Sequence, residues 1–145
     1  MAEGFLQTVR REVERFQHRG FLEALMAAAA LAAMADGDYG IAEKYRAEEL
    51  LAELPIFDVF DLREAMEILD GDVFALRSDR VAATRNLETR VSGFAGSPDR
   101  ARTLLRAAHA IIACDGVISA AEQAEFERLA RLLGLDVDSL ALAQS

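Results

Sequence analysis

Two stretches of this chain match each other and decide how it folds: MADGDYGIAEKYRAEELLAELP at positions 34–55 and ACDGVISAAEQAEFERLARLLG at positions 113–134. They align without a gap at a displacement of 79 residues. The residues they share are Asp36 with Asp115, Gly37 with Gly116, Ala42 with Ala121, Glu43 with Glu122, Glu48 with Glu127, Leu50 with Leu129 and Leu54 with Leu133. Each copy reads as a helix, an Asp-Gly turn and a second helix. A repeat of this kind predicts two helical hairpins related by approximate two-fold symmetry.

The residues around the repeat favour helices throughout. Alanine, leucine, glutamate and arginine dominate, only two prolines occur, and no run alternates β-branched with polar residues as a strand would. A chain of 145 residues is the size of one domain and can bury about 68–70% of its unfolded surface. We therefore expect an all-α protein, with residues 1–145 forming one compact bundle of about seven helices with an internal pseudo-two-fold repeat.

Apolar spacing and cap signals place these helices along the chain. Ser97 as N-cap and Pro98 in the first turn begin the sixth helix, and Ser119 begins the seventh. The expected helical ranges are 4–18, 21–35, 41–54, a short helix after 61, a long helix from 72 to about 94, 97–114 and 119–134, followed by a last turn near 136–142.

The middle of the chain divides, in this prediction, at an Asp-Gly pair. Asp61 and Glu64 fit a capping box that opens the short fourth helix, and Asp70-Gly71 closes it. Asp72 then caps the long fifth helix. One stripe along that helix is formed by Leu76, Arg80 or Val81, Thr84, Leu87, Val91 and Phe94.

Charge and cysteine content exclude several classes of protein. The chain has 25 acidic and 16 basic residues, a net charge of −9, which argues against a nucleic-acid partner and favours cations or basic partners. The single cysteine, Cys114, excludes a disulfide scaffold and a cysteine-based zinc cluster. No apolar stretch is long enough to span a membrane, and the charged N-terminus does not resemble a signal peptide, so we expect a cytoplasmic protein.

The repeated turns are the candidate functional site. In each copy the Asp follows the end of one helix, and the Glu lies in the first turn of the next, so the reversal can bring the carboxylates together. Hard cations such as Ca²⁺ and Mg²⁺ take several oxygen ligands. The candidate metal ligands are Asp36, Asp38, Glu43, Asp115 and Glu122. An EF-hand is rejected, because Ile111 and Ala113 stand where its first ligands would be.

Helix capping offers a simpler explanation of the same glutamates. Ser119 and Glu122 have the spacing of a capping box, and a carboxylate in a first turn also suits the helix dipole. Capping accounts for each glutamate alone, but it does not explain why both turns carry the Asp and why Asp38 adds another. Spacing therefore leaves capping and metal binding open.

Other reactive side chains receive structural interpretations. His109 shares a helix face with Leu105 and Ile112, which is typical of a core histidine, and Cys114 is expected to be a small buried hydrophobe. A second acidic group is interpreted as caps and solvated surface: Asp58, Asp61, Glu64, Asp70 and Asp72. The arginines of the first helix region are interpreted as a solvated face: Arg10, Arg11, Arg15 and Arg19. No phosphate loop, dinucleotide fingerprint or hydrolase motif occurs, so no catalytic residue is predicted.

The two motifs, ADGDYGIAEKYRAEELL at 35–51 and CDGVISAAEQAEFERLARLLGL at 114–135, resemble the TerB family of tellurite-resistance proteins. The resemblance extends over nearly the whole chain. It implies a seven-helix pseudo-symmetric fold, an acidic cluster that binds a divalent metal, and no established catalysis. It also implies a role in tellurite resistance and stress responses, through complexes with other Ter proteins at the inner membrane.

The acidic motif of that family falls on Asp36, Glu43, Asp115 and Glu122, and less surely on Asp38, Glu48 and Glu127. Val117 stands where the first copy has Asp38, so the second turn offers fewer ligands. The site could then be asymmetric or hold a single ion.

The resulting hypothesis is a non-enzymatic interaction module, cytoplasmic or peripherally attached to the inner membrane, with Ca²⁺ or Mg²⁺ at its acidic turns. The alternative is a metal-independent helical adaptor whose acidic turns only cap helices and bind a basic protein partner. A small hydrolase or reductase that uses the carboxylates or Cys114 ranks below both.

Overall fold

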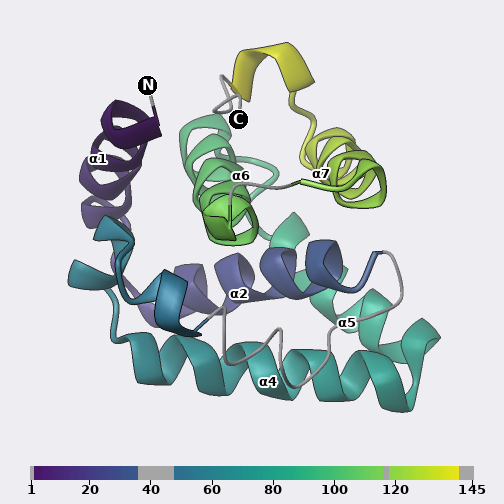
Figure 1. The fold of residues 1–145 in the computed structure, drawn as a ribbon. Coiled ribbons are helices and arrows are strands. Elements are labelled where there is room, and N and C mark those ends of the chain that lie inside the picture. The colour runs from purple at the N-terminus through teal and green to yellow at the C-terminus, as the bar shows by residue number, and fades with distance from the viewer. Residues whose placement is uncertain (1, 36–47, 116–117, 141–145) are drawn as a thin grey trace.

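The computed structural model describes residues 2–35, 48–115 and 118–140, apart from the side chains at positions 2, 3, 115 and 139. Over these ranges the chain is helical and contains no strand, which confirms the predicted all-α class (Figure 1). The elements in chain order are α1 (Ala2–Glu14), α2 (Arg19–Ala33), η1 (Pro55–Asp58), α4 (Leu62–Ser78), α5 (Arg80–Ser92), α6 (Pro98–Ile112), η2 (Ala113–Asp115), α7 (Ala120–Leu132) and η3 (Val137–Leu140). Residues 48–51 are also helical. None of the helices in these ranges has the length and apolarity needed to cross a bilayer.

Helix α2 is the centre of the molecule. Figure 1 shows it in the middle, with α4 below and α6 and α7 above, and it packs against all of these helices and against α5. Nearly every residue from Phe21 to Ala33 is buried. A helix that is apolar on all sides is expected to be buried among other helices. Its side chains must then leave room for neighbours on every side, and the alanines of α2 do so.

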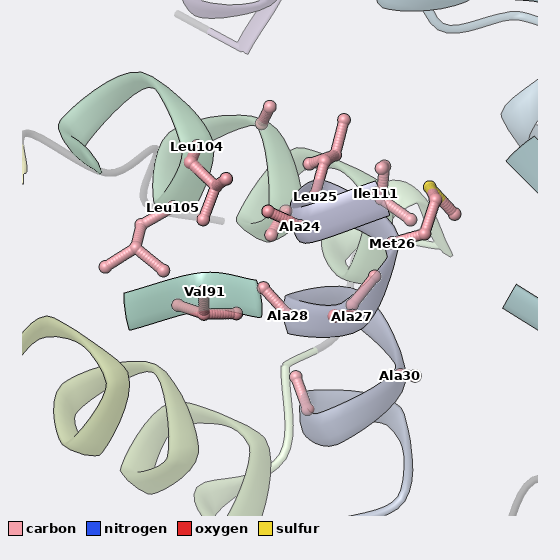
Figure 2. Packing of buried hydrophobic residues seen from close by; sticks show 14 of the residues in the cluster. Ala24, Leu25, Met26, Ala27, Ala28, Ala30, Val91, Leu104, Leu105 and Ile111 are labelled. Carbon is pink, nitrogen blue, oxygen red and sulfur yellow. The ribbon is translucent and has the colours of Figure 1, made fainter. Parts of the chain in front are cut away.

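The alanines of α2 let the surrounding helices approach closely. Figure 2 shows Ala24, Ala27 and Ala28 in one buried cluster with Val91 of α5 and Leu104 of α6. The larger side chains of the neighbours fill the space that the small ones leave, as close packing of a protein interior requires. The alanine-rich stretch of α2 therefore lies at the centre of the core.

Aromatic rings close the N-terminal end of α2. The ring of Phe21 lies 5.8 Å from that of Phe16, 6.2 Å from that of Phe60 and 5.7 Å from that of Phe94, measured between centroids. These rings come from the segments after α1, before α4 and after α5. One large apolar cluster therefore joins segments that are far apart in the sequence.

The predicted division of the middle section at Asp70-Gly71 is wrong. Helix α4 runs without interruption from Leu62 to Ser78, and the break lies at Asp79, which is extended and caps α5. A glycine inside a helix costs about 1 kcal/mol relative to alanine. The apolar row of α4 outweighs that cost, because each fully buried large apolar side chain contributes about 1.5–3 kcal/mol. This row is formed by Ala65, Met66, Leu69, Val73 and Leu76.

Asp72 is correspondingly not a helix cap. It lies inside α4, 6% exposed, and its carboxylate accepts hydrogen bonds of 3.0 and 3.2 Å from Arg90 of α5. Burial raises the pKa of Asp72, and the charge of Arg90 opposes this rise. The predicted stripe through Val81 fails for the same reason, because the break at Asp79 turns Val81 to solvent while Leu87 and Val91 stay buried.

Other boundaries follow the cap signals more closely. Asp61 caps α4 and accepts from the backbone N–H of Arg63 at 2.8 Å, as predicted. Gly134 ends α7 with φ of 73°, a conformation that glycine adopts without strain. Ser97 holds the N-cap position of α6, but its side chain makes no capping bond. Helix α1 ends at Glu14 and not at His18, whose Nδ1 accepts from Phe21 N–H and so begins α2.

Helix α1 is attached to α6 by apolar and polar contacts. Val9 and Val13 are buried in the core cluster. Glu12 accepts a hydrogen bond of 3.0 Å from the Thr103 hydroxyl and one of 2.7 Å from Arg106. This connection lies on a partly buried surface, where a charge-assisted hydrogen bond is stronger than one in open water.

Adding volume to the face of α2 should destabilise the whole fold. We expect Ala28→Leu to lower the free energy of unfolding by about 1–3 kcal/mol, because inserted methylenes force the surrounding helices apart. Ala124, exposed on α7, provides the control, since Ala124→Leu adds the same atoms to solvent. Urea denaturation measures both. Equal losses for the two variants would show that α2 is not the tightly packed element described here.

Candidate functional site

The structure describes only part of the predicted metal site. Asp36, Asp38 and Glu43 lie outside the described residues. Asp115 is the last residue of η2, and its side chain is not described. Glu122 is the one proposed ligand whose contacts are visible. Whether the five carboxylates converge therefore stays a prediction.

Glu122 takes part in a complete capping box at the start of α7. Its Oε1 accepts from the backbone N–H of Ser119 at 2.8 Å, and the Ser119 hydroxyl accepts from the N–H of Glu122 at 3.1 Å. The two bonds satisfy backbone donors that the helix start would otherwise leave unpaired. The capping interpretation of this glutamate is confirmed.

Capping also fixes where this carboxylate lies. Glu122 is half-buried in the first turn of α7. A carboxylate has two oxygens with several lone pairs, so one bond to a backbone N–H is compatible with coordination of a cation. The box therefore fixes the orientation of Glu122 at the start of α7 without deciding whether it binds an ion.

His109 lies close to this turn but points into the core. It is 4% exposed, and its ring centroid lies 5.2 Å from that of Phe126 on α7. Burial lowers the pKa of His109. Its Nδ1 is buried and has no hydrogen-bond partner among the described residues. The prediction of a core histidine is confirmed.

Cys114 is half-buried and packs against the apolar core at the end of α6. The predicted apolar packing of Cys114 is thus correct, but the side chain is only partly buried and not fully buried as expected. No group of three or more His, Cys, Asp or Glu side chains suited to a metal ion occurs within residues 2–35, 48–115 and 118–140. Of the five proposed ligands, only Glu122 has its side chain in this described part of the chain.

The first repeated turn follows the end of α2. The backbone N–H of Met34 donates to the carbonyl of Ala30 at 3.0 Å, as the C-cap of α2. Arg80, at the start of α5, donates to the carbonyl of Met34 at 2.8 Å. A basic side chain therefore occupies the helix end from which the first acidic turn departs, where a cation is favoured by the helix dipole.

Several of the acidic and basic residues interpreted as solvated surface form ion pairs there. Arg10 lies 3.5 Å from Asp58 and also pairs with Glu14, and Arg19 pairs with Glu64 as well as with Glu23. These contacts agree with the interpretation of a solvated face, since exposed pairs contribute about 0–1 kcal/mol.

Two polar contacts in the core were not predicted. Asp72 with Arg90 joins the consecutive helices α4 and α5, and Glu12 with Arg106 joins α1 to the distant α6. Each acid interrupts an apolar row. The interruption of the row is the signal from which their burial could have been suspected.

A comparison with known families completes the description of the site. The sequence model of the family described as tellurite resistance protein TerB matches residues 22–145, which include both acidic turns and every helix from α2 onward. This chain belongs to the TerB family. Helix α1 lies outside the matched range. No curated protein and no solved structure matches the chain.

Removing the Ser119 cap should destabilise this TerB protein. We expect Ser119→Ala to lower the free energy of unfolding by about 0.5–2 kcal/mol. Glu122→Gln should cost less, because glutamine also accepts the Ser119 N–H in a capping box. Ser97→Ala is the control, since the Ser97 side chain makes no capping bond. Thermal denaturation compares the three variants, and a Ser119→Ala loss no larger than that of Ser97→Ala would contradict the role of the box.

Burial of His109 should make stability depend on pH. Its folded-state pKa lies below the unfolded value of 6.5, so stability is fully present above about pH 6.5 and decreases as the pH falls through the folded-state pKa. Denaturation between pH 8 and 5.5 should show this decrease in the wild type and a smaller one in His109→Leu. Titration of the His109 ring by NMR gives a direct check, and a folded-state pKa above 6.5 would refute the explanation.

Proposed function

We propose that this TerB protein is a non-enzymatic interaction module that acts in tellurite resistance and related stress responses. The family match over residues 22–145 carries the proposal. We place the module in the cytoplasm or peripherally at the inner membrane, in complexes with other Ter proteins.

We further propose a divalent cation, Ca²⁺ or Mg²⁺, at the two acidic turns. The ligands would be Asp36, Asp38, Glu43, Asp115 and Glu122. Carboxylate oxygens are the donors that these hard cations prefer. The sharpest local support is Glu122, whose carboxylate is held by Ser119 N–H at 2.8 Å, so part of the cost of ordering a ligand is already met.

The residues near the second turn suit a hard cation better than a soft one. His109, a nitrogen donor, is buried against Phe126. Cys114 packs against the core. Neutralising the carboxylates would relieve their mutual repulsion and hold the two hairpins in one arrangement, which a partner protein could then recognise.

A metal-independent adaptor is the second candidate, and the capping box favours it. Both functions of Glu122 in that box are fulfilled without an ion. In this case the excess of acidic residues serves to attract a basic protein partner.

Calorimetric titration with CaCl₂ and with MgCl₂ separates the two candidates. Cation binding predicts a saturable heat that weakens at least about tenfold in the double variant Asp115→Asn with Glu122→Gln, because two charged ligands are lost while the glutamine keeps the cap. Ser119→Ala is the matched control, since it removes the cap and leaves every proposed ligand in place.

Absence of heat with both ions, together with a melting temperature that EDTA leaves unchanged, would refute the cation and favour the adaptor. A cell-based measurement addresses the wider function. Deletion of the gene should increase sensitivity to tellurite, and the wild-type gene should restore growth. Unchanged sensitivity after deletion would refute the assignment to tellurite resistance.

A further inference from the structure

The junction of α4 and α5 exposes two large apolar side chains. Phe74, near the end of α4, is 71% exposed, and Val81, in the first turn of α5, is 72% exposed. In the described part of the chain, Leu132 of α7 is the third such side chain, at 38%. Burying Phe74 and Val81 would be favourable by about 1.5–3 kcal/mol each, so their exposure leaves binding free energy available.

The exposure follows from how the two helices are built. Helix α4 turns Val73 and Leu76 toward the core, which places Phe74 on the opposite side. The Ser78 hydroxyl donates to the Phe74 carbonyl at 2.9 Å within the last turns of α4. After Asp79, α5 buries Ala83 and leaves Val81 outward. The position of both side chains is therefore set by regular helices and not by a loop.

Three exposed arginines lie in the same stretch of chain as these apolar side chains. Arg77, Arg80 and Arg85 are exposed in the same stretch, and neither Arg77 nor Arg85 forms an ion pair with any residue in the described ranges. The carboxylate of Asp79 accepts from the Ala82 N–H at 3.2 Å as a helix cap. We name this surface, formed by Phe74, Arg77, Arg80, Val81 and Arg85, the α4–α5 corner.

We propose that the α4–α5 corner binds a protein segment in which apolar side chains are flanked by aspartate or glutamate. Phe74 and Val81 would cover the apolar side chains, and Arg77 and Arg85 would pair with the carboxylates. Arginine binds carboxylates through two parallel hydrogen bonds, which also fixes orientation. The inference rests on the proposed role as an interaction module, but not on the cation.

Charge complementarity selects this occupant over a second copy of the chain. A two-fold contact centred on the corner would bring the Arg77 and Arg85 of both copies into one interface, and like charges close together are unfavourable. The corner is basic although the chain has a net charge of −9.

The same charge argues against a membrane. An anionic bilayer contacts a wider area than a peptide, so it would also meet the exposed carboxylates of Glu67 and Asp79. Charges beyond about 8 Å are screened at physiological salt, so the more distant acidic residues of the chain do not oppose the attraction of a small acidic partner to the corner.

The test uses a fluorescein-labelled synthetic amphipathic peptide, with leucines on one face and glutamates on both sides of it. Its dissociation constant is measured by fluorescence anisotropy with the full chain, in EDTA. We expect Phe74→Ser, and separately Arg77→Glu with Arg85→Glu, to weaken binding about tenfold or more. Leu132→Ser with Arg131→Glu, an exposed apolar and basic pair at the end of α7, is the matched control and should leave binding unchanged.

A second peptide with lysine in place of glutamate should bind at least about tenfold more weakly. Equal binding of both peptides, or equal weakening by the α7 control, would overturn the proposal. Absence of peptide binding would also overturn it. In that case, attachment to phosphatidylglycerol vesicles that Phe74→Ser abolishes would identify a membrane as the occupant, and self-association in sedimentation that Phe74→Ser abolishes would identify a second copy. Circular dichroism verifies that each variant is folded. Loss of cation heat in calorimetry leaves this result untouched, so the two proposals fail separately.

Discussion

Close packing around an alanine-rich helix is the constraint on which the rest of this structure depends. The methyl side chains of α2 allow neighbours on every side, because the distance between helix axes is set by the side chains at the contact. Each alanine buries little surface, so α2 contributes less by its own burial than by bringing α4, α5, α6 and α7 close enough to bury theirs. Alanine also loses almost no side-chain entropy on folding.

This arrangement concentrates chemical variety at the ends and outer faces of the helices. The aromatic rings gather at the N-terminal end of α2, and ion pairs between helices lie around the central packing. Arg90 joins α5 to α4, Arg106 joins α6 to α1, and Arg128 joins α7 to Glu88 of α5. Both repeated acidic turns follow the C-terminal ends of core helices, α2 and α6. The core therefore determines where the turns begin.

The parts of the fold that depend on local chemistry could be predicted from the sequence. The burial of α2 follows from its composition, and the box at Ser119 and Glu122 follows from residues three positions apart. The division at Asp70-Gly71 failed because a local turn signal competed with an apolar row that packs against α2 across the molecule. The helix propensity of glycine is about 1 kcal/mol less favourable than that of alanine, and this local cost does not include the tertiary contact of the row with α2. The interrupted apolar row of α4 indicates a buried acid at Asp72, but it does not identify the partner Arg90, which comes from another helix.

The candidate site divides in the same way. Capping by Glu122 is local, and it is described in full, whereas convergence of carboxylates from two turns depends on how distant segments meet. The burial of His109 could be predicted from its apolar helix face. The exposure of Val81 could not, because it results from the position of the break at Asp79.

The capping box at Ser119 has an energetic consequence for any ion that Glu122 binds. Its carboxylate lies at the positive end of α7, and this favourable contact with the helix dipole contributes about 0.3–1 kcal/mol. A cation that takes up the same negative charge competes with the helix for it, which lowers the affinity about two- to fivefold relative to a carboxylate in an open loop. An ion bound by Glu122 would thus have its affinity coupled to the stability of the helix start.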